Sequence, residues 1–193
     1  MDIVAHGLWA AAAYKGVNNR LEKHGNKTVR IRWAAFWGVF PDLFAFTIPW
    51  ILILFGLATG AIHPSAIPGP DSVEPPPPGG FPSSIFNLAS SLYNISHSAI
   101  VFGIVFLTVW AIRKKIMWEL GGWLIHILID IPTHSYAFFP TPALWPLSEW
   151  KFMHGISWNT GWFMAVNYSL LVVTYLSLYA SHWKNRAIPY KKI

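Results

Sequence analysis

Four long apolar stretches set the strongest limit on how this chain can fold. They cover residues 34–62, 85–112, 117–139 and 162–182. A helix needs about 20 residues to cross the hydrocarbon core of a bilayer, and each stretch reaches that length. A shorter apolar segment, 2–14, precedes them and is too short to cross alone. We therefore expect an all-α fold: a polytopic membrane bundle of four transmembrane helices plus an N-terminal half-span or interfacial helix.

The composition also favours a bilayer as the solvent. Hydrophobic residues make up 54% of the chain and charged residues only 11%, whereas soluble domains carry roughly 25% charged residues. The absence of cysteine excludes disulfides, thiolate metal sites and cysteine nucleophiles. The N-terminal sequence MDIVAHGLWAAAAYKG lacks the basic start of a signal peptide and contains Asp2 and His6, so we expect it to be retained in the mature protein.

The basic residues alternate between the connections in a way that predicts the topology. They gather in 15–32, in the turn 113–115 and in 184–192, whereas 63–84 has none and 140–161 has a single lysine. Because cytoplasmic loops are enriched in Lys and Arg, we expect both termini and the 113–115 turn in the cytoplasm. The proline-rich loop 63–84 and the loop 140–161 are then external, and residues 1–193 form one membrane domain. We interpret the formal charge of +6 as the result of basic cytoplasmic loops, and not as a sign of a surface that binds nucleic acid.

Polar residues inside the apolar segments fall at similar expected depths. At 1.5 Å per helical residue, they lie about 13 to 24 Å from the nearest basic flank. An aspartate at the centre of a transmembrane helix costs about 2.5–3.5 kcal/mol, so several together need a compensating cation. The sequence therefore predicts a metal site from five residues of four segments: His6, Asp42, His97, His126 and Asp130.

Imidazole and carboxylate ligands suit a divalent transition metal, with zinc as our first choice and manganese or iron as alternatives. Five candidate ligands exceed the three that one catalytic zinc takes from the protein, so one or two ions are expected, with an aspartate bridging a pair. The aspartate less engaged by metal, Asp42 or Asp130, is the candidate catalytic base. As an alternative, Asp42 follows Pro41 and could cap a helix that resumes at Leu43.

Three further residues are candidates for the metal site or its surroundings. His134 lies eight residues after His126 and could face the same side of a helix, but Pro132 could end the helix and turn it away. It could equally be a simple hydrogen-bond partner between helices. Ser98 and Thr133 could orient the metal ligands by hydrogen bonds to them, without binding the metal themselves.

Five motifs together resemble a known family. The segments HGLWAA, GVFPDLFAF, ISHSAIVF, GWLIHILIDIPTH and ALWPLSEWKF occur in the order seen in bacterial inner-membrane metal-dependent hydrolases, also described as LexA-binding and distantly akin to zinc phospholipase C and P1 nuclease. The resemblance covers residues 1 to about 158 and implies an inner-membrane location. The matched positions are His6, Asp42, His97, Ser98, His126 and Asp130, with Trp145 and Pro146. Many members carry His-Arg-Gly before the His-Ser pair, whereas this chain has Leu92, Tyr93 and Asn94.

Two classes of function follow from these observations. The first is a membrane-embedded metal-dependent hydrolase that cleaves a phosphoester or other ester of a lipid with a metal-activated water. The membrane lipid is then both the solvent and the substrate. The second is a non-catalytic membrane protein that binds or transports a metal, holds haem, or binds a partner. The label of hydrolase rests partly on the family resemblance, and the metal site rests on the residues themselves.

Overall fold

The computed structural model describes residues 1–67, 82–136 and 139–187, with side chains as far as residue 183. The described part of the chain is helical and contains no strand, which confirms the all-α expectation. Six α-helices and two short 3-10 turns follow in order: α1 Ile3–Lys23, α2 Ile31–Ala58, η1 Pro64–Ala66, α3 Ser83–Ser96, α4 Ala99–Arg113, η2 Trp118–Leu120, α5 Gly121–Thr133 and α6 Gly161–Ala187.

Among the described residues, two helices are long and apolar enough to cross a membrane, which indicates a membrane protein. These are α2 and the part of α6 from Gly161 to Trp183. They match the expected spans 34–62 and 162–182. The expected span 85–112 is instead the pair α3 and α4, which meet at an angle of 56° around His97 and Ser98. Together α3 and α4 are long and apolar enough to form one broken span. The described residues therefore support two or three membrane crossings.

The expected span 117–139 is not one long helix. Helix α5 has 13 residues, and at 1.5 Å per residue it is about 20 Å long, short of the roughly 30 Å hydrocarbon core. It includes Pro132 in its last turn and stops at Thr133, after which His134 is extended. Proline removes a helical N–H donor, and the chain turns away one residue later. The four transmembrane helices that we expected are therefore not confirmed.

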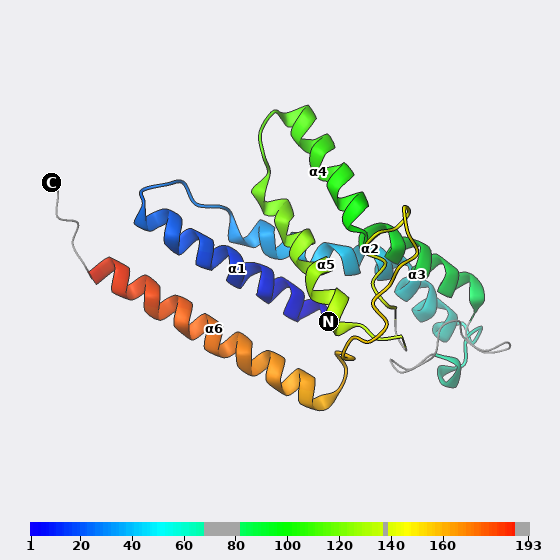
Figure 1. Cartoon of the computed structure of the whole chain (residues 1–193). Coiled ribbons are helices and arrows are strands. Elements are labelled where there is room, and N and C mark those ends of the chain that lie inside the picture. Colours follow the sequence, from blue (N-terminus) through cyan, green and yellow to red (C-terminus); the bar gives the residue numbers. More distant parts are fainter. Residues whose placement is uncertain (68–81, 137–138, 188–193) are drawn as a thin grey trace.

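Helix α1 packs against α2, α5 and α6, and Figure 1 shows it running between α6 and α2. Asp2 caps its start by accepting a hydrogen bond from the main-chain nitrogen of Ala5. The helix continues beyond the apolar segment 2–14 as far as Lys23, so its second half is polar. Its apolar half places the first residues of the chain among the other helices.

Glycines allow three helices to approach closely at the centre of the molecule. A Cβ atom added to Gly122 of α5 would lie 2.1 Å from the carbonyl oxygen of Ala34 in α2. One added to Gly38 of α2 would lie 2.6 Å from the Cβ of Ala10 in α1. Small residues at such crossings let helix backbones meet. The polar residues of the three helices are brought together as a consequence.

The segment after α5 is not a simple external loop. Its first residues, Thr141 to Ala143, are buried. The main-chain nitrogen of Ala99 donates to the carbonyl of Ala143, and that of Ile156 donates to the carbonyl of Pro132. The start of α4 and the end of α5 thus obtain hydrogen-bond partners from segment 139–158. Of the other expected loop, 63–84, the proline-rich part 68–81 lies outside the described residues.

Candidate metal centre

Four buried residues place one ligand atom each within 4.8 Å of one another: Asp42, His97, His126 and Asp130. We call them the four-residue cluster. They come from α2, the break between α3 and α4, and α5. Their side chains are buried, with His97, His126 and Asp130 fully inaccessible. Residues far apart in the sequence therefore converge on one point inside a membrane protein.

The local structure explains how each residue reaches this point. His126 and Asp130 are four residues apart on α5, so they share its buried face, and Nε2 of His126 lies 3.1 Å from Oδ2 of Asp130. His97 caps the end of α3, where its ring stacks on that of Tyr93 with centroids 3.7 Å apart. Asp42 lies inside α2, which runs unbroken past it. The alternative that Asp42 caps a helix beginning at Leu43 is therefore wrong.

The outer nitrogens of the histidines are fixed by main-chain carbonyls. Nδ1 of His126 donates to the carbonyl of Gly38 at 2.7 Å, and Nδ1 of His97 approaches the carbonyl of Tyr93 at 3.2 Å. A carbonyl can only accept, so in the neutral form of His126 the proton is on Nδ1 and the lone pair is on Nε2. This is the arrangement in which protein histidines bind metals. Nδ1 of His97 also lies 2.9 Å from the hydroxyl of Ser96, which can donate or accept.

The inner nitrogens of the two rings face one another. Nε2 of His126 and Nε2 of His97 are 3.0 Å apart, and both lie close to carboxylate oxygens of Asp42 and Asp130. Two imidazole nitrogens and two carboxylates so close together repel one another unless a cation, either a proton or a metal ion, lies between them. Two nitrogens bound to one tetrahedral zinc at about 2.0–2.1 Å are themselves about 3.3 Å apart, so the donors present fit such an ion.

The second oxygen of Asp130 faces a different set of nitrogens. Its Oδ1 lies 2.9 Å from Nε2 of His6, 3.4 Å from Nε2 of His134 and 2.5 Å from the amino group of Met1. All these groups are buried. Nδ1 of His134 donates to the carbonyl of Phe139 at 2.9 Å, so its Nε2 also points inward as an acceptor. The Asp130 carboxylate thus lies between two groups of nitrogen donors.

Several buried atoms in this region lack a hydrogen-bond partner among the described residues. They are Oδ2 of Asp130 and both ring nitrogens of His6. Oδ2 of Asp130 and Nε2 of His6 still lie within ion-pair distance of neighbours, but without hydrogen-bond geometry. Buried polar atoms are almost always satisfied in native proteins, so an orphaned carboxylate oxygen beside histidines is itself a reason to expect a cation.

The structure brings together all five residues that the sequence predicted as ligands, together with His134. Pro132 does not turn His134 away, because the chain leaves α5 in a direction that returns its ring to Asp130. Ser98 does not orient a ligand: its hydroxyl caps α4 and donates to the carbonyl of Trp145. The hydroxyl of Thr133 donates to the carbonyl of Ile129 and lies 3.4 Å from the Met1 amino group.

Two groups beside the centre were not predicted from the sequence. Tyr93 stacks on His97, and its hydroxyl lies 3.0 Å from Nδ1 of His134. Its position four residues before His97, on the same helix face, was a signal that could have revealed it. The contact of the Met1 amino group with Asp130 had no such signal, because it depends on the folding of α1 against α5.

Comparisons with protein-family models, curated proteins and solved structures give no match for this chain. The family resemblance of the five sequence motifs therefore stays a prediction.

Proposed function

We propose that this protein is a membrane-embedded metal-dependent hydrolase that cleaves a phosphoester or other ester of a lipid. The observation that carries the proposal is the convergence of two carboxylates and two inward-facing imidazoles in the four-residue cluster. Zinc suits this donor set best, and manganese or iron would also be accommodated. An ion held there would lower the pKa of a bound water toward about 7 and would polarise the scissile group.

The two aspartates differ in their distances from the neighbouring histidine nitrogens, and this difference suggests their roles. Asp130 has histidine nitrogens at 2.9 and 3.1 Å, on either side of its carboxylate. The nearest histidine nitrogens to Asp42 are at 3.4 and 3.7 Å. Asp42 is therefore the better candidate for the general base that takes a proton from the attacking water. Asp130 is the better candidate for a ligand.

A second ion is supported by the other face of Asp130. His6, His134 and Oδ1 of Asp130 would hold it in place of the Met1 amino group, which lies 2.5 Å from Oδ1 and 3.0 Å from Nε2 of His134, while Oδ2 would serve the ion of the four-residue cluster. Bridging carboxylates of this kind hold pairs of ions in many hydrolytic sites, where two metals stabilise the attacking and the leaving oxygen. The proposal is therefore one ion in the cluster and a second on the His6 side.

A lipid substrate follows from the surroundings of the site. Asp42 of the cluster lies on α2, which is apolar along its length, and many large side chains of α2, α4 and α6 are exposed as expected beside lipid. A lipid reaches such a site laterally more easily than a water-soluble substrate does. The proposed setting is a bacterial inner membrane, with the basic segments 15–32, 113–115 and 184–193 cytoplasmic and with α5 and its following segment completing the fourth crossing. The N-terminus itself is not at the cytoplasmic surface, because the Met1 amino group is buried 2.5 Å from Asp130.

One observation favours a second candidate function. His97, His126 and Asp130 are fully inaccessible, and a site closed to solvent suits a non-catalytic membrane protein that stores, carries or is stabilised by a metal. In that case the ion would be retained, but no ester would be hydrolysed.

The deciding experiment measures metal content and hydrolysis on the same preparations. Protein purified in detergent is assayed by elemental analysis and against phosphoester and carboxylic-ester lipids, with zinc, manganese or iron added. We expect Asp42→Asn to lower hydrolysis at least 100-fold and to retain most of the metal, and His126→Ala to lose both. His63→Ala, at an exposed position, is the control. Metal without hydrolysis in the unaltered protein would establish the second candidate function, and no metal would refute both.

A further inference from the structure

Tyr93 contacts the polar centre on both of its sides. It belongs to α3, and only 1% of its surface is exposed. Its ring stacks on that of His97, with the two planes inclined by 20°, and its hydroxyl lies 3.0 Å from Nδ1 of His134. His97 belongs to the four-residue cluster, whereas His134 faces Oδ1 of Asp130, as His6 does. One side chain thus touches a histidine from each of the two groups of nitrogen donors.

Tyr93 constrains the ring of His97 in two ways. His97 is the residue that ends α3, so its own main chain no longer continues the helix. One face of its ring rests on the Tyr93 ring, with centroids 3.7 Å apart. Its Nδ1 also lies 3.2 Å from the main-chain oxygen of Tyr93. With one face and Nδ1 held in this way, Nε2 of His97 is directed at the carboxylates of Asp42 and Asp130, each 3.4 Å away.

The hydroxyl of Tyr93 constrains His134 in a different way. His134 follows the last residue of α5 and has an extended main chain, so the regular geometry of the helix does not fix its ring. Its Nδ1 faces two oxygens, the Tyr93 hydroxyl at 3.0 Å and the carbonyl of Phe139 at 2.9 Å. Both contacts are on the nitrogen that does not face Asp130. They therefore set the direction of Nε2 of His134, which lies 3.4 Å from Oδ1 of Asp130.

Packing alone does not require a tyrosine at this position. The Tyr93 ring also contacts Phe46 and Phe139, with centroids 5.9 and 5.2 Å away, and a phenylalanine would make the same ring contacts without a polar atom. A buried hydroxyl is costly unless it is hydrogen-bonded. Its partners here include His134 and, at 3.4 Å, the hydroxyl of Thr141. The contact with His134 gives the hydroxyl a role that the ring alone cannot fill.

We propose that Tyr93 is a positioning residue that couples the two halves of the metal centre. Its ring directs Nε2 of His97 toward the ion of the four-residue cluster, and its hydroxyl directs Nε2 of His134 toward the second ion. This inference rests on the two ions of the proposed function, but not on hydrolysis. Groups that orient metal ligands contribute about 10- to 100-fold to metal affinity. Because the ring and the hydroxyl act on different ions, their loss should have different consequences.

Cobalt(II) binding to the full-length protein in detergent tests the proposal with two variants. The protein is freed of metal with a chelator, and cobalt(II) is then titrated by calorimetry and by its visible absorption spectrum. The unaltered protein should bind two ions. Tyr93→Phe keeps the ring and should weaken the binding of only one ion, by about 10-fold or more, and alter the spectrum of that ion alone. Tyr93→Leu removes the ring as well and should weaken the binding of both.

The pattern across the two ions decides the outcome, and Tyr93→Phe is sufficient if Tyr93→Leu does not fold. Equal affinities in Tyr93→Phe and the unaltered protein, or an equal loss for both ions, would overturn the proposal. Fewer than two ions in the unaltered protein would overturn it as well, because there would be no pair of sites to couple. Two bound ions without hydrolysis of any lipid ester would refute the hydrolase and leave this inference standing.

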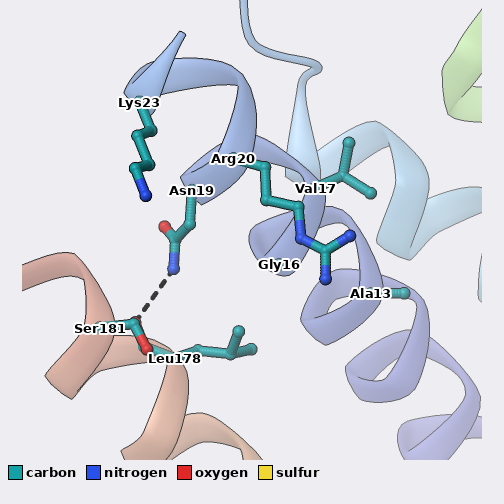
Figure 2. Close-up of a pocket in the computed structure, with 8 residues that line it drawn as sticks. All are labelled: Ala13, Gly16, Val17, Asn19, Arg20, Lys23, Leu178 and Ser181. Atoms are coloured by element: carbon teal, nitrogen blue, oxygen red, sulfur yellow. Dashed lines mark hydrogen bonds between the residues drawn. The ribbon is translucent and has the colours of Figure 1, made fainter. Parts of the chain in front are cut away.

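Tyr175→Phe is the matched control, because it removes the same hydroxyl from a tyrosine that bonds outside the metal centre. The hydroxyl of Tyr175 on α6 donates to the carbonyl of Leu8 on α1 at 2.9 Å. Farther along the same two helices, Nδ2 of Asn19 donates to the carbonyl of Leu178, beside the pocket drawn in Figure 2. This second bond still joins α1 to α6 in the control. Tyr175→Phe should therefore bind both ions as the unaltered protein does, and the loss expected of Tyr93→Phe, if found in the control, would overturn the proposal.

Discussion

Asp130 is the residue on which both sides of the polar centre depend. One of its oxygens faces the histidines of the four-residue cluster, and the other faces His6 and His134. Its side chain is fully inaccessible. A carboxylate so placed cannot be solvated by water, so its charge must be balanced by the groups around it. A change at this position therefore acts on every neighbour at once.

We expect Asp130→Asn to remove the metal while preserving the fold. The amide has the same shape as the carboxylate, but it lacks the negative charge that a divalent ion requires. A chelator should lower the thermal midpoint of the unaltered protein by several degrees, because a bound ion stabilises the folded state. The variant should show little response to the chelator and little bound metal. Thermal midpoints with and without chelator, beside elemental analysis, measure both effects.

Glu149→Gln is the control for this prediction, since it also removes one carboxylate, but from an exposed position. It should retain both the metal and the response to chelator. An unchanged chelator response in Asp130→Asn would assign Asp130 to packing and not to metal binding.

The residues of the polar centre could be predicted from the sequence because a buried charge is costly wherever it lies in a membrane segment. His6, Asp42, His97, His126 and Asp130 each stood out in an apolar stretch, and similar depths suggested that they meet. The role of Ser98 could not be predicted in this way, because its partner, Trp145, lies in a segment whose return to the membrane region has no local signal. The same holds for the approach of Met1 to Asp130.

At the scale of the elements, the contact between α2 and α5 is the most sensitive feature. Gly122 brings α5 so close to α2 that a Cβ atom would meet a main-chain oxygen, which cannot move as a side chain can. The hydrogen bond from His126 to the carbonyl of Gly38 spans the same contact. Separation of the two helices would therefore also pull a candidate ligand away from the centre.

We expect Gly122→Ala to destabilise the protein by about 1–3 kcal/mol, the usual cost of inserting atoms into a closely packed site. It should lower metal content as well, because His126 moves with α5. Gly103→Ala in α4 is the control, since a Cβ atom there meets nothing within 4 Å. In a helix interior that change should stabilise by about 0.5–1 kcal/mol. Denaturation midpoints in detergent would reveal opposite signs, and equal effects would contradict the packing argument.

The elements differ in how far the sequence predicts them. Helices α2 and α6 follow from apolar length alone, because a single helix satisfies its own backbone groups within a bilayer. The end of α5 and the break between α3 and α4 depend on partners elsewhere. The main-chain groups exposed there bond with Ala143, Ile156 and Trp158. No local pattern in the sequence specifies such distant partners. We therefore expected continuous helices over 85–112 and 117–139, where the structure has a break and an early helix end.

At the scale of the whole molecule, the distribution of basic residues predicts how the protein is oriented. The absence of native cysteine makes single cysteines unambiguous probes. We expect a cysteine at position 72 to react with a membrane-impermeant reagent on intact cells, because 63–84 is predicted to be external. A cysteine in place of Lys115 should react only after permeabilisation. Labelling in the opposite order would reverse the topology, and labelling of both positions on intact cells would refute the span assignment.

The short helix α5 has a consequence for the surrounding lipid. Beside α2 and α6 the hydrocarbon layer can keep its full thickness, whereas in the proposed topology α5 offers it only about 20 Å of regular helix. A bilayer adapts to a short hydrophobic helix by thinning locally, at a cost of fractions of a kcal/mol per ångström of mismatch. The headgroup boundary is then drawn inward on that side. The ester bonds of a lipid, which lie at this boundary, would need to travel less far to reach the buried carboxylates than they would beside a full-length helix.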